Sequence, residues 1–184
     1  LKLEPNQYTV KVRGVEVARG EIMPGYYLAI DNGMVTTRIS GTATTEPAFG
    51  LPAVWISEDQ RSDAEQRNYT VVPSSSVLAT HLTEVIKRHA DELLTREQTH
   101  QLLETLKEKS PKAVDDVVPN LIKVGELQRV LQNLLRERVP VRDLETILET
   151  LGDWAPRTKD VDILTEYARN ALARTICQLY KDKD

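Results

Sequence analysis

The sequence is short of cysteine, of aromatic residues and of long hydrophobic runs. Its one cysteine, Cys177, excludes an internal disulfide and argues against a thiolate metal site, so a reducing, cytosolic setting is the simpler expectation. The chain has no stretch of about 18 apolar residues and no signal-peptide pattern, so we expect it neither to span a membrane nor to direct its own secretion. Its 184 residues are enough for a sizeable core, which predicts one domain or two closely packed subdomains.

An excess of basic residues is also missing. The net charge is −4, with 9 basic against 12 acidic residues up to Leu94 and 15 against 16 beyond it. Proteins that bind nucleic acid gather Lys and Arg on one face to neutralise phosphates. The sequence therefore predicts no nucleic-acid partner.

Enzyme signatures are missing as well: there is no phosphate-binding glycine loop, dinucleotide fingerprint or nucleophile elbow. Three histidines are the candidates for proton transfer near neutral pH. His81 and His89 are eight positions apart, on roughly the same helix face, with Ser76, Asp91 and Glu92 near them in sequence. This spacing does not supply a nucleophile, a base and an orienting group. We predict no catalytic residue, and an unrecognised site at His81 or His89 is the alternative.

A metal site has one weak candidate. Glu97 and His100 are three positions apart on a predicted helix, which is the spacing found in di-iron bundles. Such sites need a second Glu-x-x-His and two further Glu ligands, and the sequence has no second copy. We interpret these residues as a solvated helix face and predict no metal and no cofactor.

What is present changes character along the chain. Six of the eight Gly and six of the nine aromatic residues lie within residues 1–69, where period-two alternation predicts strands at 8–12 and 15–17. The segment 26–30 ends at the turn signal Asp31-Asn32-Gly33 and is also expected to be a strand, and 54–56 and 69–72 are two further strand candidates. After Pro73 the apolar period approaches 3.6 and predicts helices. The fold class is therefore mixed α+β, with small mixed subdomains in the N-terminal half followed by an all-helical subdomain.

The expected helices have recognisable ends. Ser74 or Ser75 is placed to cap a helix that carries Val77, His81, Leu82, Val85, Ile86, His89 and Leu93 on its apolar side. Thr95 with Gln98 resembles a capping box, and Ser110-Pro111 opens a short helix before Pro119. Further helices are expected at 125–138, from 141 to Gly152 with a break at Pro140, and after Asp160.

The segment 44–56 holds the only Phe and one of the two Trp, in a turn-rich stretch. Pro47 and Pro52 fix φ, Gly50 permits close backbone approach, and Phe49 offers a large apolar face between them. Phe49 is thus either an ordinary core residue or an exposed contact for a partner.

Four stretches of the sequence together resemble the FlhA family, the export-gate proteins of type III secretion, whose relatives include LcrD and InvA. They are RGVEVARGE at 13–21, EPAFGLPAVWI at 46–56, YTVV at 69–72 followed by VLATHL at 77–82, and VLQNLL at 130–135 followed by VPVRDLETILETL at 139–151. The resemblance covers nearly the whole chain, in order, and the wording of the motifs is more flagellar than injectisome-like.

The resemblance implies a piece of an inner-membrane protein, with this region on the cytoplasmic face. Residues 1–24 and 74–94 would form a discontinuous first cytoplasmic subdomain, 25–73 an inserted second one, and 95–184 a helical third one. The membrane-spanning part and a fourth subdomain would lie outside this sequence.

The resemblance also implies a function and a site. Family members form nine-membered rings and dock export chaperones with bound cargo in a dimple between the first two subdomains. Other export-apparatus components are further partners that the resemblance implies. The corresponding partner-binding positions here are Glu46, Pro47, Phe49, Gly50, Leu51 and Thr80.

We therefore expect a shallow apolar dimple with a carboxylate at its rim. By side-chain type, Leu51 and Trp55 are better suited to the core than to contact, and the Thr80 hydroxyl could bond a carbonyl one turn earlier. The alternative function is a structural ring segment whose partners dock elsewhere.

Overall fold

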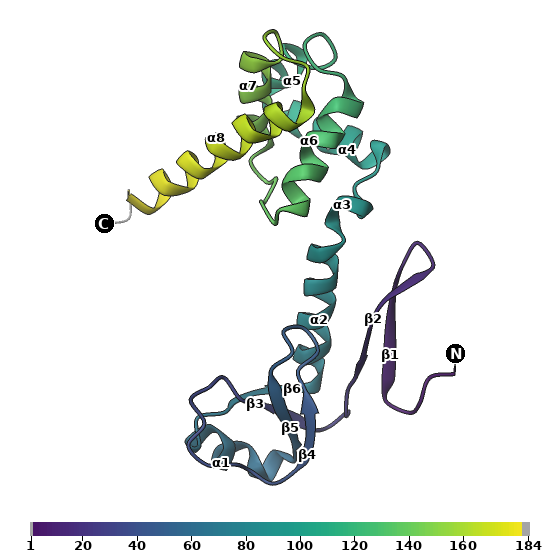
Figure 1. Ribbon diagram of the computed structural model, residues 1–184, viewed down its shortest axis with the longest axis vertical. Coiled ribbons are helices and arrows are strands. Elements are labelled where there is room, and N and C mark those ends of the chain that lie inside the picture. Colours follow the sequence, from purple (N-terminus) through teal and green to yellow (C-terminus); the bar gives the residue numbers. More distant parts are fainter. Residues whose placement is uncertain (1, 182–184) are drawn as a thin grey trace. The chain divides into compact units, whose positions relative to one another are not determined.

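A computed structural model describes residues 2–181 of the chain, and the backbone only of residues 176 and 178–181. The chain divides into two compact units, Leu1–Ile86 and Lys87–Asp184, with the boundary in the last turn of a helix. The fold is mixed α+β, as predicted, with strands and helices in the first unit and helices in the second (Figure 1). The division into three subdomains stays a prediction.

The first unit contains a two-stranded hairpin and a four-stranded antiparallel sheet of order β4-β5-β3-β6. Its strands are β1 (Gln7–Val12), β2 (Val15–Glu21), β3 (Tyr27–Ile30), β4 (Thr42–Thr45), β5 (Pro52–Ile56) and β6 (Thr70–Pro73). All the predicted strands are confirmed. β4 was not predicted, because Thr42-Ala43-Thr44-Thr45 shows no apolar alternation and lies at the edge of the sheet.

Both faces of the four-stranded sheet are covered, because successive side chains of a strand point to opposite sides. Ala29 and Ile56 pack on one side with Ala64 of α1 (Arg61–Gln66). Leu28 and Trp55 pack on the other side with Val77 of α2 (Ser74–Arg88). The six-residue α1, which follows the 3-10 turn η1 (Glu58–Gln60), was not predicted because it has too few apolar positions to show a period.

Helix α2 corrects the sequence-based expectation in three ways. It begins at Ser74 itself, directly after β6, so neither Ser74 nor Ser75 precedes it as a cap. It ends at Arg88, because the backbone of His89 leaves the helical region before α3 (Ala90–Leu93) begins. Its buried residues are Val77, His81 and Val85, whereas Leu82 and Ile86 are exposed. The apolar side of α2 that the spacing predicts is therefore wider than the side that packs against the rest of the first unit.

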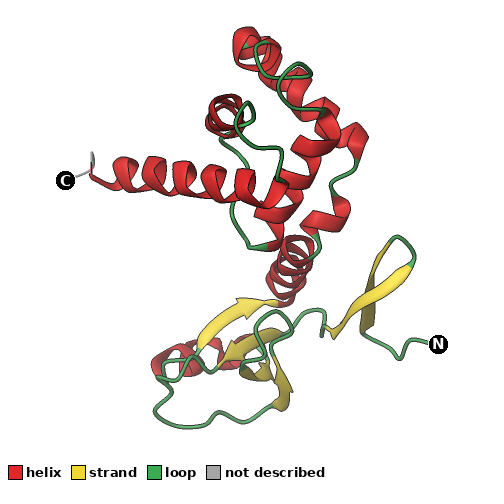
Figure 2. Ribbon diagram, turned by 45° about the horizontal axis from the view of Figure 1, so that its top comes forward, coloured by secondary structure: helices red, strands yellow, loops and turns green. Residues whose placement is uncertain are grey.

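The second unit is built from helices and loops in the part of the chain that the structure describes (Figure 2). Besides α3, it contains α4 (Arg96–Lys109), α5 (Pro111–Asp115), α6 (Val124–Arg136), α7 (Leu144–Trp154) and α8 (Val161–Lys181). At its centre lies α6, whose Leu127, Val130, Leu131 and Leu134 are fully buried. Their spacing of three and four places them on one face, against α8 and the shorter helices.

The predicted helix ends of this unit are confirmed only in part. Ser110 precedes α5 but makes no side-chain cap hydrogen bond, α6 ends at Arg136 and not at 138, and α7 begins at Leu144 and not at 141. The Thr95 and Gln98 side chains and backbones bond reciprocally in a capping box at the start of α4. The chain leaves α6 before Pro140 and restarts at Asp143, whose carboxylate accepts from the Thr146 amide at 3.2 Å. Gly152 does not end α7, which continues to Trp154. A Cβ at position 152 would lie 3.0 Å from the Val117 side chain, so Gly152 allows α7 to pack closely against Val117.

Candidate functional site

The segment between β4 and β5 is a hairpin loop closed by backbone hydrogen bonds. Thr45 pairs with Pro52, the Glu46 amide donates to the Leu51 carbonyl at 2.8 Å, and the Gly50 amide donates to the Glu46 carbonyl at 2.9 Å. Gly50 has φ 72°, in the left-handed region that glycine adopts without strain. The loop therefore has a defined shape that favours glycine at this position.

Glu46 fixes the inside of this loop. Its side chain is only 3% exposed, and its two carboxylate oxygens accept hydrogen bonds from the Ala48 amide at 3.0 Å and the Phe49 amide at 2.7 Å. Hydrogen bonds to a charged acceptor are the strong ones among protein hydrogen bonds. We expected this carboxylate at the exposed rim of a dimple. The structure places it beneath the loop, where it accepts hydrogen bonds from the loop backbone.

Phe49 points outward from the loop. It is 62% exposed, whereas the neighbouring Ala48 is buried and Pro47 is half-buried. Of the two interpretations that the sequence left open, the core residue is wrong and the exposed aromatic is right. Trp55 is buried as expected, but Leu51 is exposed, because the loop carries it past the edge of the sheet.

The other predicted position, Thr80, is exposed on α2. The structure gives its hydroxyl no hydrogen bond to any described residue, and it is Thr83 that donates to a carbonyl one turn earlier, at Ala79, over 2.8 Å. Leu82 and Ile86 follow on the same helix with exposed side chains.

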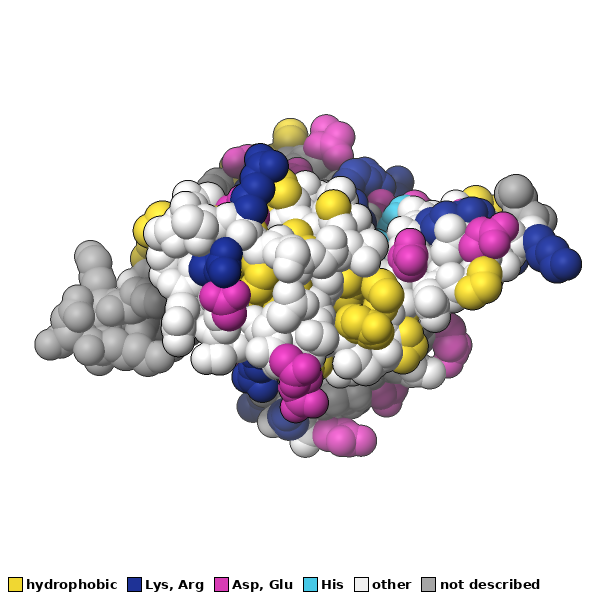
Figure 3. Space-filling model, turned by 90° about the horizontal axis from the view of Figure 1, so that it is seen from below, with side chains coloured by type: hydrophobic (Ala, Val, Ile, Leu, Met, Phe, Trp, Pro, Cys, Tyr) yellow, Lys and Arg dark blue, Asp and Glu magenta, His cyan; other side chains and the backbone are white. Residues whose placement is uncertain are grey.

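Exposed hydrophobic side chains are frequent on the first unit. The face drawn in Figure 3 carries them in small clusters between charged side chains. The large ones in this unit are Leu3, Val15, Tyr26, Met34, Phe49, Leu51, Leu82 and Ile86. Exposed apolar clusters rimmed by polar groups are typical of protein-binding surfaces.

Tyr8 joins the β1–β2 hairpin to α2. Its hydroxyl lies 2.6 Å from Nδ1 of the buried His81, the residue after Thr80. Burial first, and the negative charge of Glu46 second, raise the pKa of the Tyr8 phenol. The phenol is therefore uncharged at neutral pH. This contact was not predicted, since Tyr8 and His81 are 73 positions apart and Tyr8 fits an ordinary strand pattern.

Two of the three histidines considered for catalysis have side-chain partners in the structure. His81 bonds to Tyr8, and His89 lies 3.2 Å from its near neighbour Glu92. His100 is exposed on α4. Within residues 2–181, no group of three or more His, Cys, Asp or Glu side chains is arranged to hold a metal ion.

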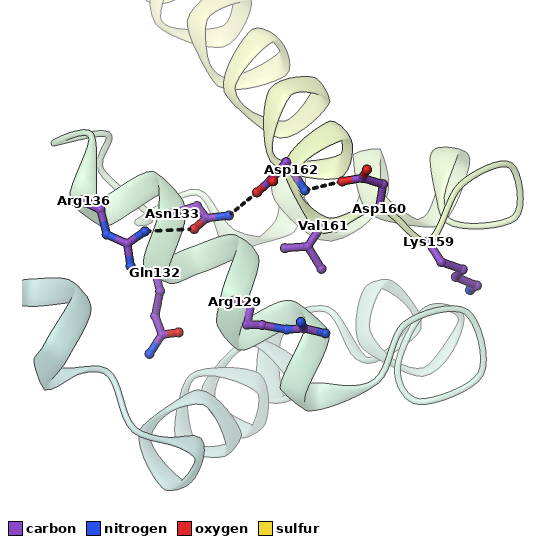
Figure 4. A pocket seen from close by; sticks show the side chains of 8 residues that line it. All are labelled: Arg129, Gln132, Asn133, Arg136, Lys159, Asp160, Val161 and Asp162. Carbon is purple, nitrogen blue, oxygen red and sulfur yellow. Dashed lines mark hydrogen bonds between the residues drawn. The ribbon is translucent and has the colours of Figure 1, made fainter.

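A polar hollow of about 470 Å³ lies in the second unit, between α6 and the start of α8 (Figure 4). Asn133 bridges its two sides, donating to Asp162 at 3.4 Å and accepting from Arg136 at 3.4 Å, while Asp160 accepts from the Asp162 amide at 2.9 Å. Arg136 also pairs with Asp91. The bond between Asn133 and Asp162 attaches α8 to α6. No buried polar side-chain atom of the described residues lacks a hydrogen-bond partner, so none in the hollow is left for a ligand. We therefore interpret the hollow as structural.

None of the described helices has the length and apolar character that crossing a bilayer requires.

The chain matches the model of the FHIPEP family over residues 1–184. It is 49% identical over 176 residues to the flagellar biosynthesis protein FlhA of Bacillus subtilis, covering 96% of this chain and 26% of that protein. The chain thus spans about a quarter of the length of this relative.

Solved structures agree with this match. The CdsV protein of Chlamydia pneumoniae superposes with a TM-score of 0.81 at 28% identity, over 95% of this chain and 51% of that one. The nonameric EscV cytosolic domain from a type III secretion system shares the fold, with a TM-score of 0.69 at 21% identity over 98% and 54% of the two chains. By its full-length match and its identity to the Bacillus relative, the chain belongs to the FHIPEP family.

Proposed function

We propose that this chain is part of the cytoplasmic docking platform of a flagellar type III export gate, where it binds export chaperones with their cargo. The observation that carries the proposal is Phe49, 62% exposed at the tip of a loop whose backbone is fixed from beneath by Glu46. Pro47, Gly50, Leu51 and Thr80 would complete the contact surface. The function is non-enzymatic and requires no cofactor.

The geometry suits the capture of a partner helix or extended segment. An exposed aromatic ring offers a large apolar contact, and such residues are frequent among those that dominate binding energy. Because the loop is already ordered by its own hydrogen bonds, little further ordering is required when a partner covers it. Leu51 extends the apolar surface beside Phe49.

The test is the substitution Phe49→Ala, measured by titrating a labelled flagellar export chaperone–cargo complex against the chain. We expect binding to weaken by about 2 kcal/mol, roughly 30-fold, with an unchanged melting temperature, since an exposed ring contributes little to the fold. Met34→Ala is the matched control, because Met34 is 71% exposed on the same unit and lies outside the site. Unchanged affinity of the Phe49 variant would reject the docking function.

A second candidate function is a structural ring segment of a flagellar or injectisome export gate, with docking supplied by other parts. It is motivated by the nonameric assembly of the EscV cytosolic domain, which shares the fold. Absence of saturable chaperone binding, together with self-association of the chain, would favour this role.

In either role we propose that the parent protein lies in the bacterial inner membrane, with this region on the cytoplasmic face. Its other partners would be copies of itself and further export-apparatus components. The membrane contact would be made by parts of the parent protein outside this sequence.

A further inference from the structure

The β1–β2 hairpin is joined to α2 by the side chain of Tyr8. The phenol hydroxyl lies 2.6 Å from Nδ1 of His81, and the two rings meet edge to face, with their centres 5.6 Å apart. His81 is buried, so this hydrogen bond is sheltered from competing water. The contact fixes the hairpin to the helix turn that carries Thr80.

Gly20 makes room for this arrangement. It is the cross-strand partner of Tyr8 in the hairpin, and the Tyr8 ring lies directly across its backbone. A Cβ at position 20 would lie 2.3 Å from the Tyr8 hydroxyl oxygen and 2.4 Å from Cζ, far inside contact distance. Any larger residue at position 20 would displace the ring and with it the hydroxyl that reaches His81.

The charge of Glu46 also affects the pKa of the Tyr8 phenol. The charge of this buried carboxylate contributes to the raised pKa of Tyr8, so the two groups interact electrostatically. Glu46 in turn holds the Ala48 and Phe49 amides. The contact that the structure gives the Tyr8 hydroxyl is with His81, in the turn of α2 that carries Thr80.

We propose that Tyr8, resting on Gly20, is a positioning residue for the docking surface. Its hydroxyl holds the Thr80 turn of α2 through His81, so that a partner meets this turn in one arrangement. The hairpin thereby takes part in binding without touching the partner. This inference rests on the proposed docking function.

The test is Tyr8→Phe, which removes one oxygen and leaves the ring over Gly20. One hydrogen bond contributes about 0.5–1.5 kcal/mol net, so we expect the labelled chaperone–cargo complex to bind about three- to tenfold more weakly. The matched control is Tyr69→Phe, which removes a buried hydroxyl that accepts from the Ile39 amide at 3.3 Å in the core of the same unit. An equal effect of the two substitutions on affinity overturns the proposal.

A double substitution separates positioning from loss of stability. If Tyr8 acts by holding the Thr80 turn, adding Tyr8→Phe to Thr80→Ala should weaken binding by clearly less than Tyr8→Phe does in the wild-type chain. A loss of the same size in both backgrounds would show a general effect and overturn the proposal.

Gly20→Ala gives an independent test, because it displaces the ring without altering the phenol. It should reproduce the binding loss of Tyr8→Phe, and wild-type affinity would contradict the proposal. The outcomes also separate the two hypotheses. If Phe49→Ala binds with wild-type affinity, the docking function is rejected, and with it the surface that Tyr8 would position. If Phe49→Ala binds weakly but Tyr8→Phe binds as the wild type does, only the role of Tyr8 is rejected.

Discussion

Glu46→Gln is the sharpest test of how the loop that carries Phe49 is built. The buried carboxylate accepts two backbone hydrogen bonds, at 3.0 and 2.7 Å, one on each oxygen. Glutamine has one acceptor oxygen, and its NH₂ group would face the second N–H as donor against donor. One hydrogen bond to a charged group contributes about 1.5–3 kcal/mol, so we expect the first unit to lose about that much stability.

The loss is large enough to measure by thermal unfolding. For a unit of this size, 1 kcal/mol corresponds to a shift of about 4–8 °C, so the melting transition of the first unit should fall by roughly 10 °C. Amide hydrogen exchange at Ala48 and Phe49 should accelerate in the Gln variant, since these are the two bonded N–H groups. Glu46→Asp is the control. It keeps the charge and both oxygens, and short carboxylates commonly accept from amides two and three positions ahead.

Two results would refute this reasoning in different ways. A Gln variant with wild-type melting and wild-type exchange at both amides would show that the carboxylate does not hold the loop. A Gln variant with wild-type melting and exchange but weaker chaperone binding would show that Glu46 acts by touching the partner, and the loop would be shaped by its backbone alone.

The remaining predictions concern one helix end and one titration. Thr95→Ala should destabilise the second unit by about 1 kcal/mol in urea unfolding, because the Gln98 amide loses the hydroxyl that it bonds at 3.2 Å. Thr95→Ser keeps a hydroxyl and should retain most of this stability. Equal stability of the two variants would argue against the cap. Burial and Glu46 raise the pKa of Tyr8, so its proton adds stability that is complete below the unfolded pKa of about 10 and is lost as pH rises through the folded pKa. As the pH rises above about 10, Tyr8→Phe should therefore lose less stability than the wild type, and parallel pH profiles would contradict this.

Regular elements with a clear period were accessible from the sequence. The α6 helix places Leu127, Val130, Leu131 and Leu134 at spacings of one, three and four, and the structure buries all four. The Thr95–Gln98 capping box is local, so its geometry follows from the residue types and their spacing. The strands β1 and β2 begin with a visible alternation of apolar and polar positions, whereas β3, β5 and β6 were indicated by short runs rich in aliphatic and aromatic residues.

Elements without a period were missed, for a physical reason. β4 is an edge strand of Thr and Ala that gains its hydrogen bonds from β5, a partner that the local sequence does not reveal. Leu82 and Ile86 belong to the apolar stripe of α2 by spacing, but whether a stripe is covered depends on what packs against it. The structure leaves both exposed.

For the candidate site, the sequence alone determined that a loop rich in proline and glycine carries the single Phe, and that the chain has balanced charge and no catalytic motif. The tertiary structure alone decided that Phe49 is exposed, that Glu46 is buried beneath the loop, and that Tyr8 joins the β1–β2 hairpin to the Thr80 turn. Backbone preferences act over a few residues and are written in the local sequence. Burial and the contact between Tyr8 and His81 depend on distant segments, which meet only when the chain has folded.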